Sequence, residues 1–189
     1  MKWKFLATQE TYDGTQLISL QNYLQHKILG DSIVAWIGPC DVHVEHMVDG
    51  EDLLENAKIC GSSMLHFIIE KFDSSLFAAV AMQRLFASVV KDEVQLLAKN
   101  REQALALIRE GDDLFVGGKK LSISIATQSP MSSLVHFAMN VSNAGTPVPT
   151  LSMQDLELLP KPFAESVMAK FCNEIESMVQ ATQKVRWVR

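Results

Sequence analysis

The fold is decided by the stretch Gly111-Asp112-Asp113-Leu114-Phe115-Val116-Gly117-Gly118-Lys119-Lys120-Leu121-Ser122. Two short β-prone runs flank a Gly-Gly pair, and glycine accepts the positive φ that a tight hairpin turn requires. We therefore predict a hairpin whose strands cover 113–116 and 119–126. Because side chains alternate across a strand, Lys119 and Lys120 should point in opposite directions.

Outside the hairpin, strands and helices follow one another without a regular alternation. Short β-prone runs predict strands, and apolar residues three and four positions apart predict helices. The predicted strands cover 4–8, 32–37, 64–70 and 134–141, and the predicted helices cover 15–29, 74–98 and 163–184. This irregular order favours an α+β fold over a doubly wound α/β sheet.

Individual residues set the expected limits and faces of these elements. Gly30 should close the first helix, and Gly38-Pro39 should end the strand over 32–37. The residues expected to face inward are Leu17, Leu20 and Leu24 in the first helix and Val167, Phe171, Ile175, Met178 and Val179 in the last. The polar segment 39–60 is not assigned, and 102–109 is ambiguous between helix and strand.

The composition is that of a globular protein. A chain of 189 residues suits a single domain spanning 1–189, with 48% hydrophobic and 21% charged residues. The formal net charge of -5 argues against a nucleic-acid backbone or an anionic membrane as the main partner, because both reward excess Lys and Arg. No run of about 18 apolar residues occurs, so no membrane span is expected.

The start of the chain and the cysteines point to a compartment. Residues 1–6 lack the apolar core of a signal peptide. The three cysteines, Cys40, Cys60 and Cys172, are odd in number and widely spaced, so they do not predict a disulfide framework. We therefore expect a cytoplasmic protein.

The hairpin resembles the lysine hairpin of biotin and lipoate protein ligases. In those families an Asn-Asp-Leu strand turns through a short Gly-containing loop into a strand that carries a lysine. By that match Lys120 takes the position of the lysine that reaches the carboxylate and phosphate of the acyl-adenylate, and Asp113 that of the aspartate. Downstream, His136-Phe137-Ala138-Met139-Asn140-Val141 resembles their glycine-rich strand ending in Asn-Val, so Asn140 is a ligand-binding candidate.

Nearly the whole chain resembles a family known as domain of unknown function 366. The resemblance implies a mixed, largely antiparallel sheet flanked by helices, as in the catalytic domain of the biotin and lipoate ligases. The segments that carry it are Tyr12-Asp13-Gly14-Thr15-Gln16-Leu17, Gly30-Asp31-Ser32-Ile33-Val34, Gly38-Pro39-Cys40-Asp41-Val42, His46-Met47-Val48-Asp49, Gly145-Thr146-Pro147-Val148-Pro149 and Lys184-Val185-Arg186-Trp187.

The chemistry of the hairpin agrees with this resemblance. A lysine on a rigid strand beside a tight turn is a preorganised charge, which can stabilise negative charge developing at a carboxylate. Asp113 can orient Lys120, or help to hold magnesium with the phosphates of ATP. The plainer interpretation is that both lysines belong to a solvated turn.

The chain departs from the ligases in its loop over 38–46. Biotin ligases have an Arg- and Gly-rich loop here, and lipoate ligases have Arg followed by a glycine run, whereas this loop contains no arginine and one glycine. Gly38, Cys40 and His46 are its ligand-binding candidates. The departure leaves open whether ATP binds and whether the protein is catalytic.

The same loop has a pattern of metal-binding side chains. Cys40, His43 and His46 are spaced Cys-x2-His-x2-His, and thiolate and imidazole are good zinc ligands. The spacing matches no standard zinc signature, so we expect a polar loop at the rim of a cleft and no structural metal.

Three further residues are weighed against plainer roles. Arg84, on the helix over 74–98, can pair with a carboxylate or phosphate, or extend to water. Octanoyltransferases of the ligase superfamily use a cysteine with a lysine, which makes Cys40 and Cys172 candidate nucleophiles, but Cys172 lies in a predicted amphipathic helix and should be buried. His66, between apolar residues, should be a hydrogen-bonded core histidine.

Two functions therefore remain open. One is an enzyme that activates or transfers a small carboxylate, with or without ATP and magnesium, and with an acyl carrier as a candidate partner. The other is a non-catalytic binding protein that kept the fold and lost the phosphate loop. In either case Lys120 and Asp113 should face one cleft beneath the Cys40–Asp49 loop. The oligomeric state is left open, with a homo-oligomer among the alternatives.

Overall fold

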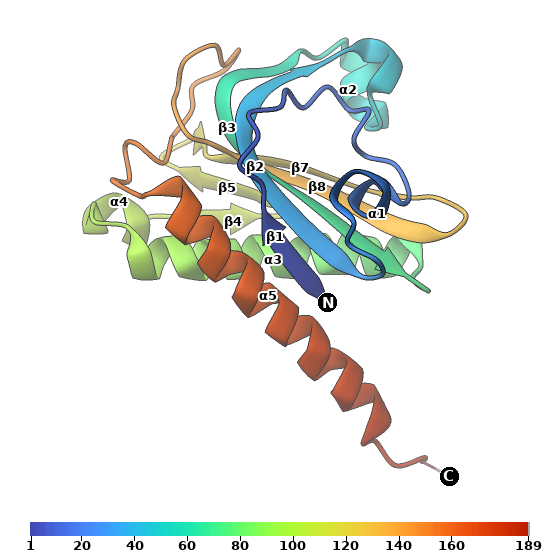
Figure 1. Ribbon diagram of the computed structural model, residues 1–189. Coiled ribbons are helices and arrows are strands. Elements are labelled where there is room, and N and C mark those ends of the chain that lie inside the picture. Colours follow the sequence, from blue (N-terminus) through green and yellow to red (C-terminus); the bar gives the residue numbers. More distant parts are fainter. Residues whose placement is uncertain (189) are drawn as a thin grey trace.

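The computed structural model describes residues 1–188, which form two β-sheets and the helices around them (Figure 1). The main sheet has five strands in the order β1-β2-β3-β8-β7, and β1 and β2 form its one parallel pair among the described residues. Its strands are β1 (Lys2–Phe5), β2 (Ser32–Val42), β3 (Ile59–Phe72), β7 (Ser122–Gln128) and β8 (Ser132–Asn140). The predicted α+β fold with a mixed, largely antiparallel sheet is confirmed.

The hairpin joins the two sheets. The smaller sheet consists of β4 (Ile108–Glu110), β5 (Asp113–Val116) and β6 (Lys119–Lys120). The predicted outgoing strand is divided at buried Leu121, whose N–H donates to the carbonyl of Leu114 at 2.8 Å. The chain then enters the main sheet as β7, so Lys120 stands where the two sheets meet.

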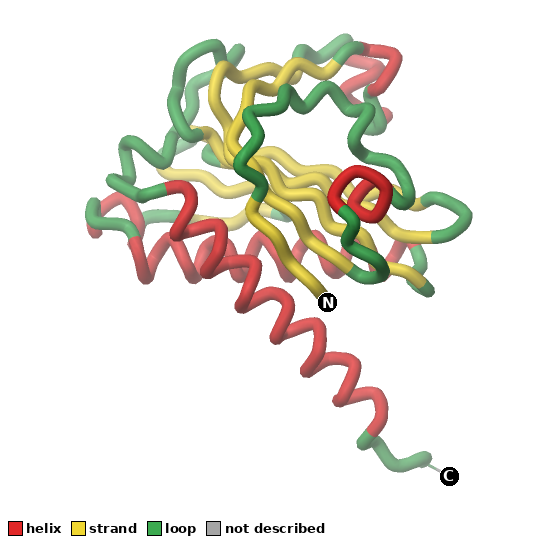
Figure 2. Tube along the Cα trace, viewed as in Figure 1, coloured by secondary structure: helices red, strands yellow, loops and turns green. Residues whose placement is uncertain are grey.

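The main sheet has two different faces. Helices α3 (Leu76–Leu97) and α5 (Pro160–Gln183) pack on one of them (Figure 1). Because strand side chains alternate, the odd-numbered residues of β3, such as Phe67, belong to this helix-covered core. The even-numbered residues, such as Met64 and Ile68, face the other side. The loop that joins β1 to α1 (Gln21–His26) passes over that second face (Figure 2).

Aromatic rings fill the core beneath the helices. Phe86 of α3 is fully buried and makes edge contacts with Phe67, Phe137 and Phe171, at ring-centroid distances of 5.1, 5.1 and 4.9 Å. Helix α3 begins after Ser75, whose side chain accepts a hydrogen bond from the N–H of Ala78. The predicted helix over 74–98 is confirmed.

The predicted helix over 15–29 is wrong in its first half. Leu17 is buried as expected, but Leu24 is 66% exposed and Leu20 has a φ of 65°, which interrupts a helix. The buried carboxylate of Glu70 explains this conformation, because it accepts a hydrogen bond from the N–H of Leu20 at 2.8 Å. A contact with residue 70 therefore overrides the local helical pattern.

The strand predicted over 32–37 continues to Val42. A register shift between Gly38 and Cys40 places Pro39 at an irregularity of the strand pairing, where a missing N–H is tolerated. The unassigned segment 39–60 contains, besides the end of β2, a turn of 3-10 helix, η1 (Val44–His46), helix α2 (Gly50–Glu55) and the first two residues of β3. The ambiguous segment 102–109 is divided between α4 (Arg101–Leu105) and β4.

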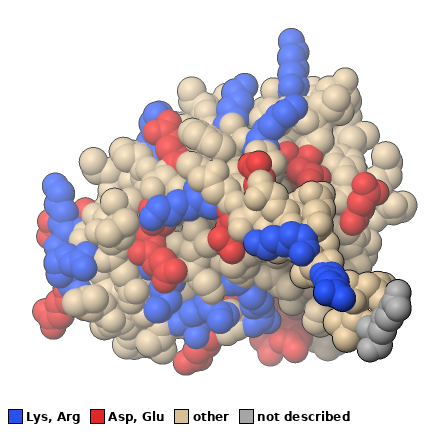
Figure 3. Space-filling view, turned by 90° about the horizontal axis from the view of Figure 1, so that it is seen from below, with Lys and Arg blue, Asp and Glu red and all other residues tan. Residues whose placement is uncertain are grey.

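The last helix is longer than the domain that it packs against. Val167, Phe171 and Ile175 are buried as predicted, but Met178 and Val179 are 47% and 43% exposed. Their predicted burial is wrong because the second half of α5 extends beyond the sheet (Figure 1). Positive and negative side chains are interspersed on this side of the molecule (Figure 3). None of the helices within residues 1–188 combines the length and apolar composition needed to cross a membrane.

Candidate functional site

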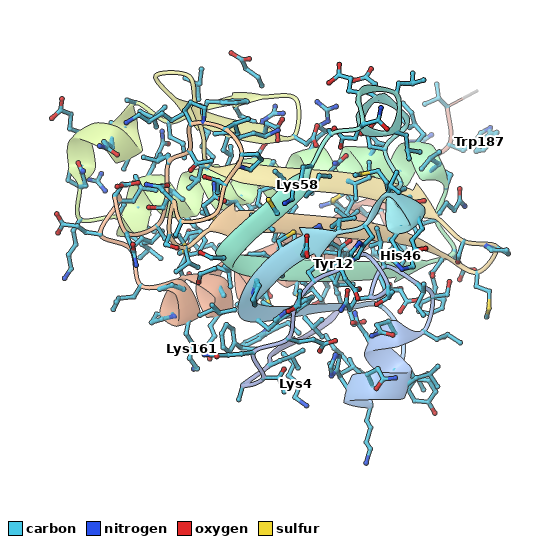
Figure 4. The ribbon with its side chains drawn as sticks, turned by 90° about the horizontal axis from the view of Figure 1, so that it is seen from above. Lys4, Tyr12, His46, Lys58, Lys161 and Trp187 are labelled. Atoms are coloured by element: carbon cyan, nitrogen blue, oxygen red, sulfur yellow. The ribbon has the colours of Figure 1, made fainter. Side chains whose placement is uncertain are left out.

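A cavity of about 460 Å³ lies on the sheet face opposite α3 and α5. This volume is in the range of small-molecule sites. Its apolar lining includes Val42, Met47, Val48, Ile59, Met64, Ile123, Ile125 and Val148. Three of the residues that line it, Tyr12, His46 and Lys58, lie over the sheet when the molecule is viewed from above, whereas Lys4 and Lys161 lie at its edge (Figure 4).

Lys120 and Asp113 both line this cavity, and their side chains form an ion pair of 2.8 Å. The backbone of Lys120 is held on two sides. Its carbonyl accepts hydrogen bonds from the N–H of Leu151 at 3.0 Å and from Nδ2 of Asn140 at 3.1 Å, and its N–H donates to the carbonyl of Pro149. Lys119 is exposed and lies outside the cavity lining.

Asp113 is coupled to this lysine. Burial raises the pKa of the Asp113 carboxyl, and the hydrogen bond and charge of Lys120 oppose that rise. The side chains of Lys120 and Asp113 are 32% and 27% exposed, so solvent partly screens the pair. Asp113 therefore orients the ammonium group and is itself stabilised as a carboxylate by it.

Asn140 lies in the cavity lining, but its amide is used by the fold. Besides the Lys120 carbonyl, Nδ2 donates to the carbonyl of Leu151 at 3.2 Å. The residue is buried at the end of β8. It fastens the segment before β7 to the loop at 150, and so fixes where Lys120 stands.

Arg84, another predicted ligand-binding residue, lies outside the cavity lining. It is on α3, and its guanidinium pairs with Asp112 at 3.3 Å. The Asp112 carboxylate also accepts hydrogen bonds from Gln83 Nε2 at 2.8 Å and Ser124 Oγ at 2.7 Å. This pairing ties α3 to the hairpin, and the predicted contact of Arg84 with a ligand stays a prediction.

Gly38 and Cys40 also lie outside the cavity lining. A side chain at 38 would collide with the carbonyl of Glu10, so glycine is needed for close backbone packing. Cys40 is 2% exposed, and burial raises the pKa of its thiol to about 12. The expected Cys40–Asp49 loop over the cleft begins only after Val42, because β2 carries Cys40 into the sheet.

His46 does line the cavity, close to Gly14, whereas His43 is exposed and does not. Cys40 is buried within β2, so the three residues of the Cys-x2-His-x2-His pattern are not brought to one point. In residues 1–188 no group of three or more His, Cys, Asp or Glu side chains is arranged to hold a metal ion. Cys172 is buried as expected, and burial raises the pKa of its thiol to about 11.

A stacked cluster of aromatic residues forms the part of the site that sequence reasoning missed. The ring of Tyr12 stacks on His136 with centroids 3.6 Å apart, and both residues line the cavity. Nδ1 of His66 is 3.1 Å from Nε2 of His136, and Nε2 of His66 is 3.2 Å from the carbonyl oxygen of Gly38. His66 is a hydrogen-bonded core histidine, as predicted, and His136 extends this contact to the cavity.

Both histidines are neutral at physiological pH. Burial lowers the pKa of His66 to about 4. The pKa of His136 lies well below its usual value, mainly because of burial and secondly because of the charge that His66 would carry. Burial also raises the pKa of the Tyr12 hydroxyl, so the phenol stays protonated. The cluster is therefore a polar but uncharged surface.

These depressed pKa values predict a stability that falls as the pH falls. The unfolded chain binds protons near pH 6.5, whereas folded His66 binds one only near pH 4, so acid favours the unfolded state within this window. Lowering the pH from about 7.5 to about 5 should reduce the free energy of unfolding by about 2 kcal/mol for His66 alone. Urea unfolding at the two pH values measures this.

A suitable control is His43→Ala, because His43 is exposed and lies outside the histidine pair. His26, whose pKa is also lowered by burial, acts in the same direction. An unfolding free energy that stays constant between pH 7.5 and pH 5 would contradict neutral burial of the pair.

The charges of the cavity do not fit a triphosphate. The lining carboxylates are Asp49, Glu51, Asp52, Asp112 and Asp113, and the lining lysines are Lys58 and Lys120. Arg84 and Lys120 pair with Asp112 and Asp113, which leaves three carboxylates against Lys58. Burial and the nearby Asp49 raise the pKa of Asp52. A polyphosphate would meet repulsion here, and the residues present do not supply the donors that ATP requires.

The fold is that of the biotin and lipoate protein ligases. A biotin protein ligase from Aquifex aeolicus, in complex with biotin and ATP, superposes with a TM-score of 0.59 at 10% identity over 93% of this chain and 70% of its own. A proposed lipoate protein ligase from T. acidophilum, with bound lipoic acid, gives a TM-score of 0.55 at 13% identity over 93% of this chain and 86% of its own. At such identities the similarity establishes the fold alone.

The chain belongs to the family described as domain of unknown function DUF366, which matches residues 1–186. A protein of unknown function from Pyrococcus horikoshi is 36% identical, with a TM-score of 0.90 over 99% of this chain and all of its own. An uncharacterised protein of Methanocaldococcus jannaschii is 28% identical over 80% of this chain and 69% of its own. The sequence-based resemblance to this family is therefore confirmed.

Proposed function

We propose that the cavity binds a small carboxylic acid or its acyl derivative, with the carboxyl group at Lys120, and that the protein activates or transfers the acyl group. The observation that carries the proposal is the Lys120–Asp113 pair of 2.8 Å at the wall of a cavity that also has apolar walls, Ile123 and Ile125 among them. An oriented ammonium group beside apolar walls suits a ligand with one negative end and a hydrocarbon body. The protein structures that share this fold bind biotin and lipoic acid, which have that form.

The reaction favoured by the cavity is acyl transfer from an activated donor such as a thioester. The acyl carbon would exchange its bond to sulfur for a bond to an acceptor nitrogen or oxygen, with the thiol as leaving group. The carbonyl oxygen gains negative charge as the acceptor attacks, and Lys120 stabilises that charge. This route needs no triphosphate, in keeping with the acidic lining.

The second candidate is a binding protein for the same acid without catalysis. Two observations favour it: the segment at 38–42 is strand rather than a glycine-rich phosphate loop, and Gly38 and Cys40 lie outside the cavity lining. In this case the cavity and Lys120 keep their roles in recognition, and the acyl group is left unchanged.

Thermal unfolding separates the ligands. A ligand that binds only the native state stabilises it by about 2.7 kcal/mol at a concentration one hundred times its Kd. We expect a medium-chain carboxylic acid to raise Tm and ATP with magnesium to leave it unchanged. Stabilisation by ATP with magnesium, together with pyrophosphate release when the acid is added, would contradict the nucleotide-free route.

Catalysis is then tested by mixing the protein with a medium-chain acyl thioester and an amine acceptor. Appearance of free thiol together with the acylated amine supports transfer. Stabilisation by the acid without either product favours the binding protein. Absence of stabilisation by any carboxylic acid would overturn the proposal.

A further inference from the structure

We propose that Nδ1 of His136 is a hydrogen-bond acceptor in the cavity wall, which selects ligands carrying an N–H or O–H group at the end remote from the carboxyl. The inference deepens the proposed function and rests on it for the carboxyl end. A good ligand therefore carries a hydrogen-bond donor in addition to its carboxylate. Acids with a plain hydrocarbon chain should bind more weakly than acids that carry such a donor.

The hydrogen-bond chain sets the tautomer of both histidines. A carbonyl oxygen only accepts, so the nitrogen of His66 that is 3.2 Å from the Gly38 oxygen must carry a hydrogen, which places the proton on Nε2. Nδ1 of neutral His66 is then an acceptor, and Nε2 of His136, at 3.1 Å, must donate to it. A neutral histidine ring carries a single N–H proton, and in His136 that proton is on Nε2. Nδ1 of His136 therefore carries a lone pair.

This lone pair is open to a ligand. Within residues 1–188 no protein group donates a hydrogen bond to Nδ1 of His136, and the buried unpartnered side-chain atoms of this part are Oδ1 of Asn22 and Oε1 of Gln103. Nδ1 is in neither group, so a small part of its surface is accessible although His136 as a whole is 3% exposed, and the residue lines the cavity. Tyr12 covers a face of the ring, with 11° between the two ring planes, and does not reach the nitrogen itself as a hydrogen-bond donor.

The two polar contacts lie apart along one strand. Asn140, which holds the backbone carbonyl of Lys120, is four residues from His136 on β8, so the backbones of these two β8 residues are roughly 13 Å apart at the rise of a β-strand. A ligand can therefore place its carboxyl near Lys120 and a second polar group near His136. Between them the lining residues Ile123 and Ile125 supply apolar contact.

Four matched probes test the inference: octanoic acid, its terminal hydroxyl derivative, and the methyl ester of each. Leaving a polar group unpaired costs about 1–3 kcal/mol, and 1.4 kcal/mol is tenfold in Kd. We expect both hydroxyl probes to bind wild-type protein about tenfold more tightly than their methyl-ended partners. In His136→Phe, which keeps a flat ring for Tyr12, the two should bind equally, and in the control His43→Phe the preference should persist.

The design separates this inference from the carboxylate proposal. The acid–ester comparison reports on Lys120, and the hydroxyl–methyl comparison within the ester pair reports on His136. Equal affinity of acid and ester with a retained hydroxyl preference would refute the carboxylate role and support His136. Equal affinity for hydroxyl and methyl ends, or binding of none of the four probes, would overturn the inference.

A spectroscopic measurement covers the case in which His136→Phe fails to fold. Long-range proton–nitrogen NMR of wild-type protein distinguishes protonated from unprotonated ring nitrogens. We expect Nδ1 of His136 to be unprotonated in the free protein and its resonance to move on addition of the hydroxyl acid. A proton on Nδ1 would overturn the inference.

Discussion

Lys120→Ala is expected to reduce the rate of acyl transfer about a hundredfold. The ammonium group is held at 2.8 Å from Asp113 in the cavity wall, so it is in place before charge develops on the acyl oxygen. Losing one such preorganised donor costs roughly 3 kcal/mol of transition-state stabilisation. Single-turnover rates with a bound acyl thioester measure the effect on the chemical step.

The same substitution should have a small effect on folding. The ion pair is partly exposed, and such pairs contribute about 1 kcal/mol or less. Lys119→Ala is the matched control, because the neighbouring lysine is exposed and lies outside the cavity lining. If both variants lost activity equally, or if Lys120→Ala lost activity only in proportion to lost folded protein, the catalytic role would be excluded.

Phe86→Ala is expected to lower the free energy of unfolding by about 4 kcal/mol, the usual cost of removing a buried phenylalanine. Its ring meets three others in the core between the sheet and the helices. Ligand affinity should change little at temperatures where the variant is folded, because the cavity lies on the opposite face of the sheet. Chemical denaturation and calorimetric binding measure the two effects separately.

Phe77→Ala is the control for that prediction. Phe77 lies on the same helix and is 85% exposed, so its removal should change stability by less than about 0.5 kcal/mol. A Phe86→Ala protein as stable as wild type would show that α3 does not pack as described. Loss of ligand binding by folded Phe86→Ala would show that the two faces of the sheet are not independent.

The elements that were predicted correctly are those determined by local residues. The Gly117-Gly118 pair alone predicts the hairpin turn, because glycine accepts the positive φ that such a turn requires. In the structure both glycines have positive φ. The long helix α3 follows from its apolar spacing. The first predicted helix fails because Leu20 is held by Glu70, which is fifty residues away in the sequence, and no local pattern contains that contact.

The candidate site divides in the same way. Sequence resemblance brings Lys120 and Asp113 to attention in the hairpin, and Asn140 in the strand further along the chain. Gly38 and Cys40 lie in a strand and not in the expected loop; Gly38 packs against the carbonyl of Glu10, and the Cys40 side chain is buried. Arg84 was assigned to the ligand, but its partner is a carboxylate of the hairpin itself.

The histidine pair was missed for a different reason. Each residue alone, His66 or His136, is a polar residue in an apolar strand, which is usually a core histidine. Their contact joins positions 70 residues apart and depends on the register between β3 and β8. A histidine in each of two neighbouring buried strands was the available signal, and only the strand order brings the two together.

The central claim is that Lys120 binds a carboxylate, and isothermal titration of octanoic acid against its methyl ester tests it most directly. We expect wild-type protein to bind the acid at least about tenfold more tightly than the ester, since a charged hydrogen bond contributes about 1.5–3 kcal/mol. In Lys120→Ala we expect equal affinities for the two probes. Equal affinities in wild-type protein, or a preference for the acid that survives in Lys120→Ala, would contradict it.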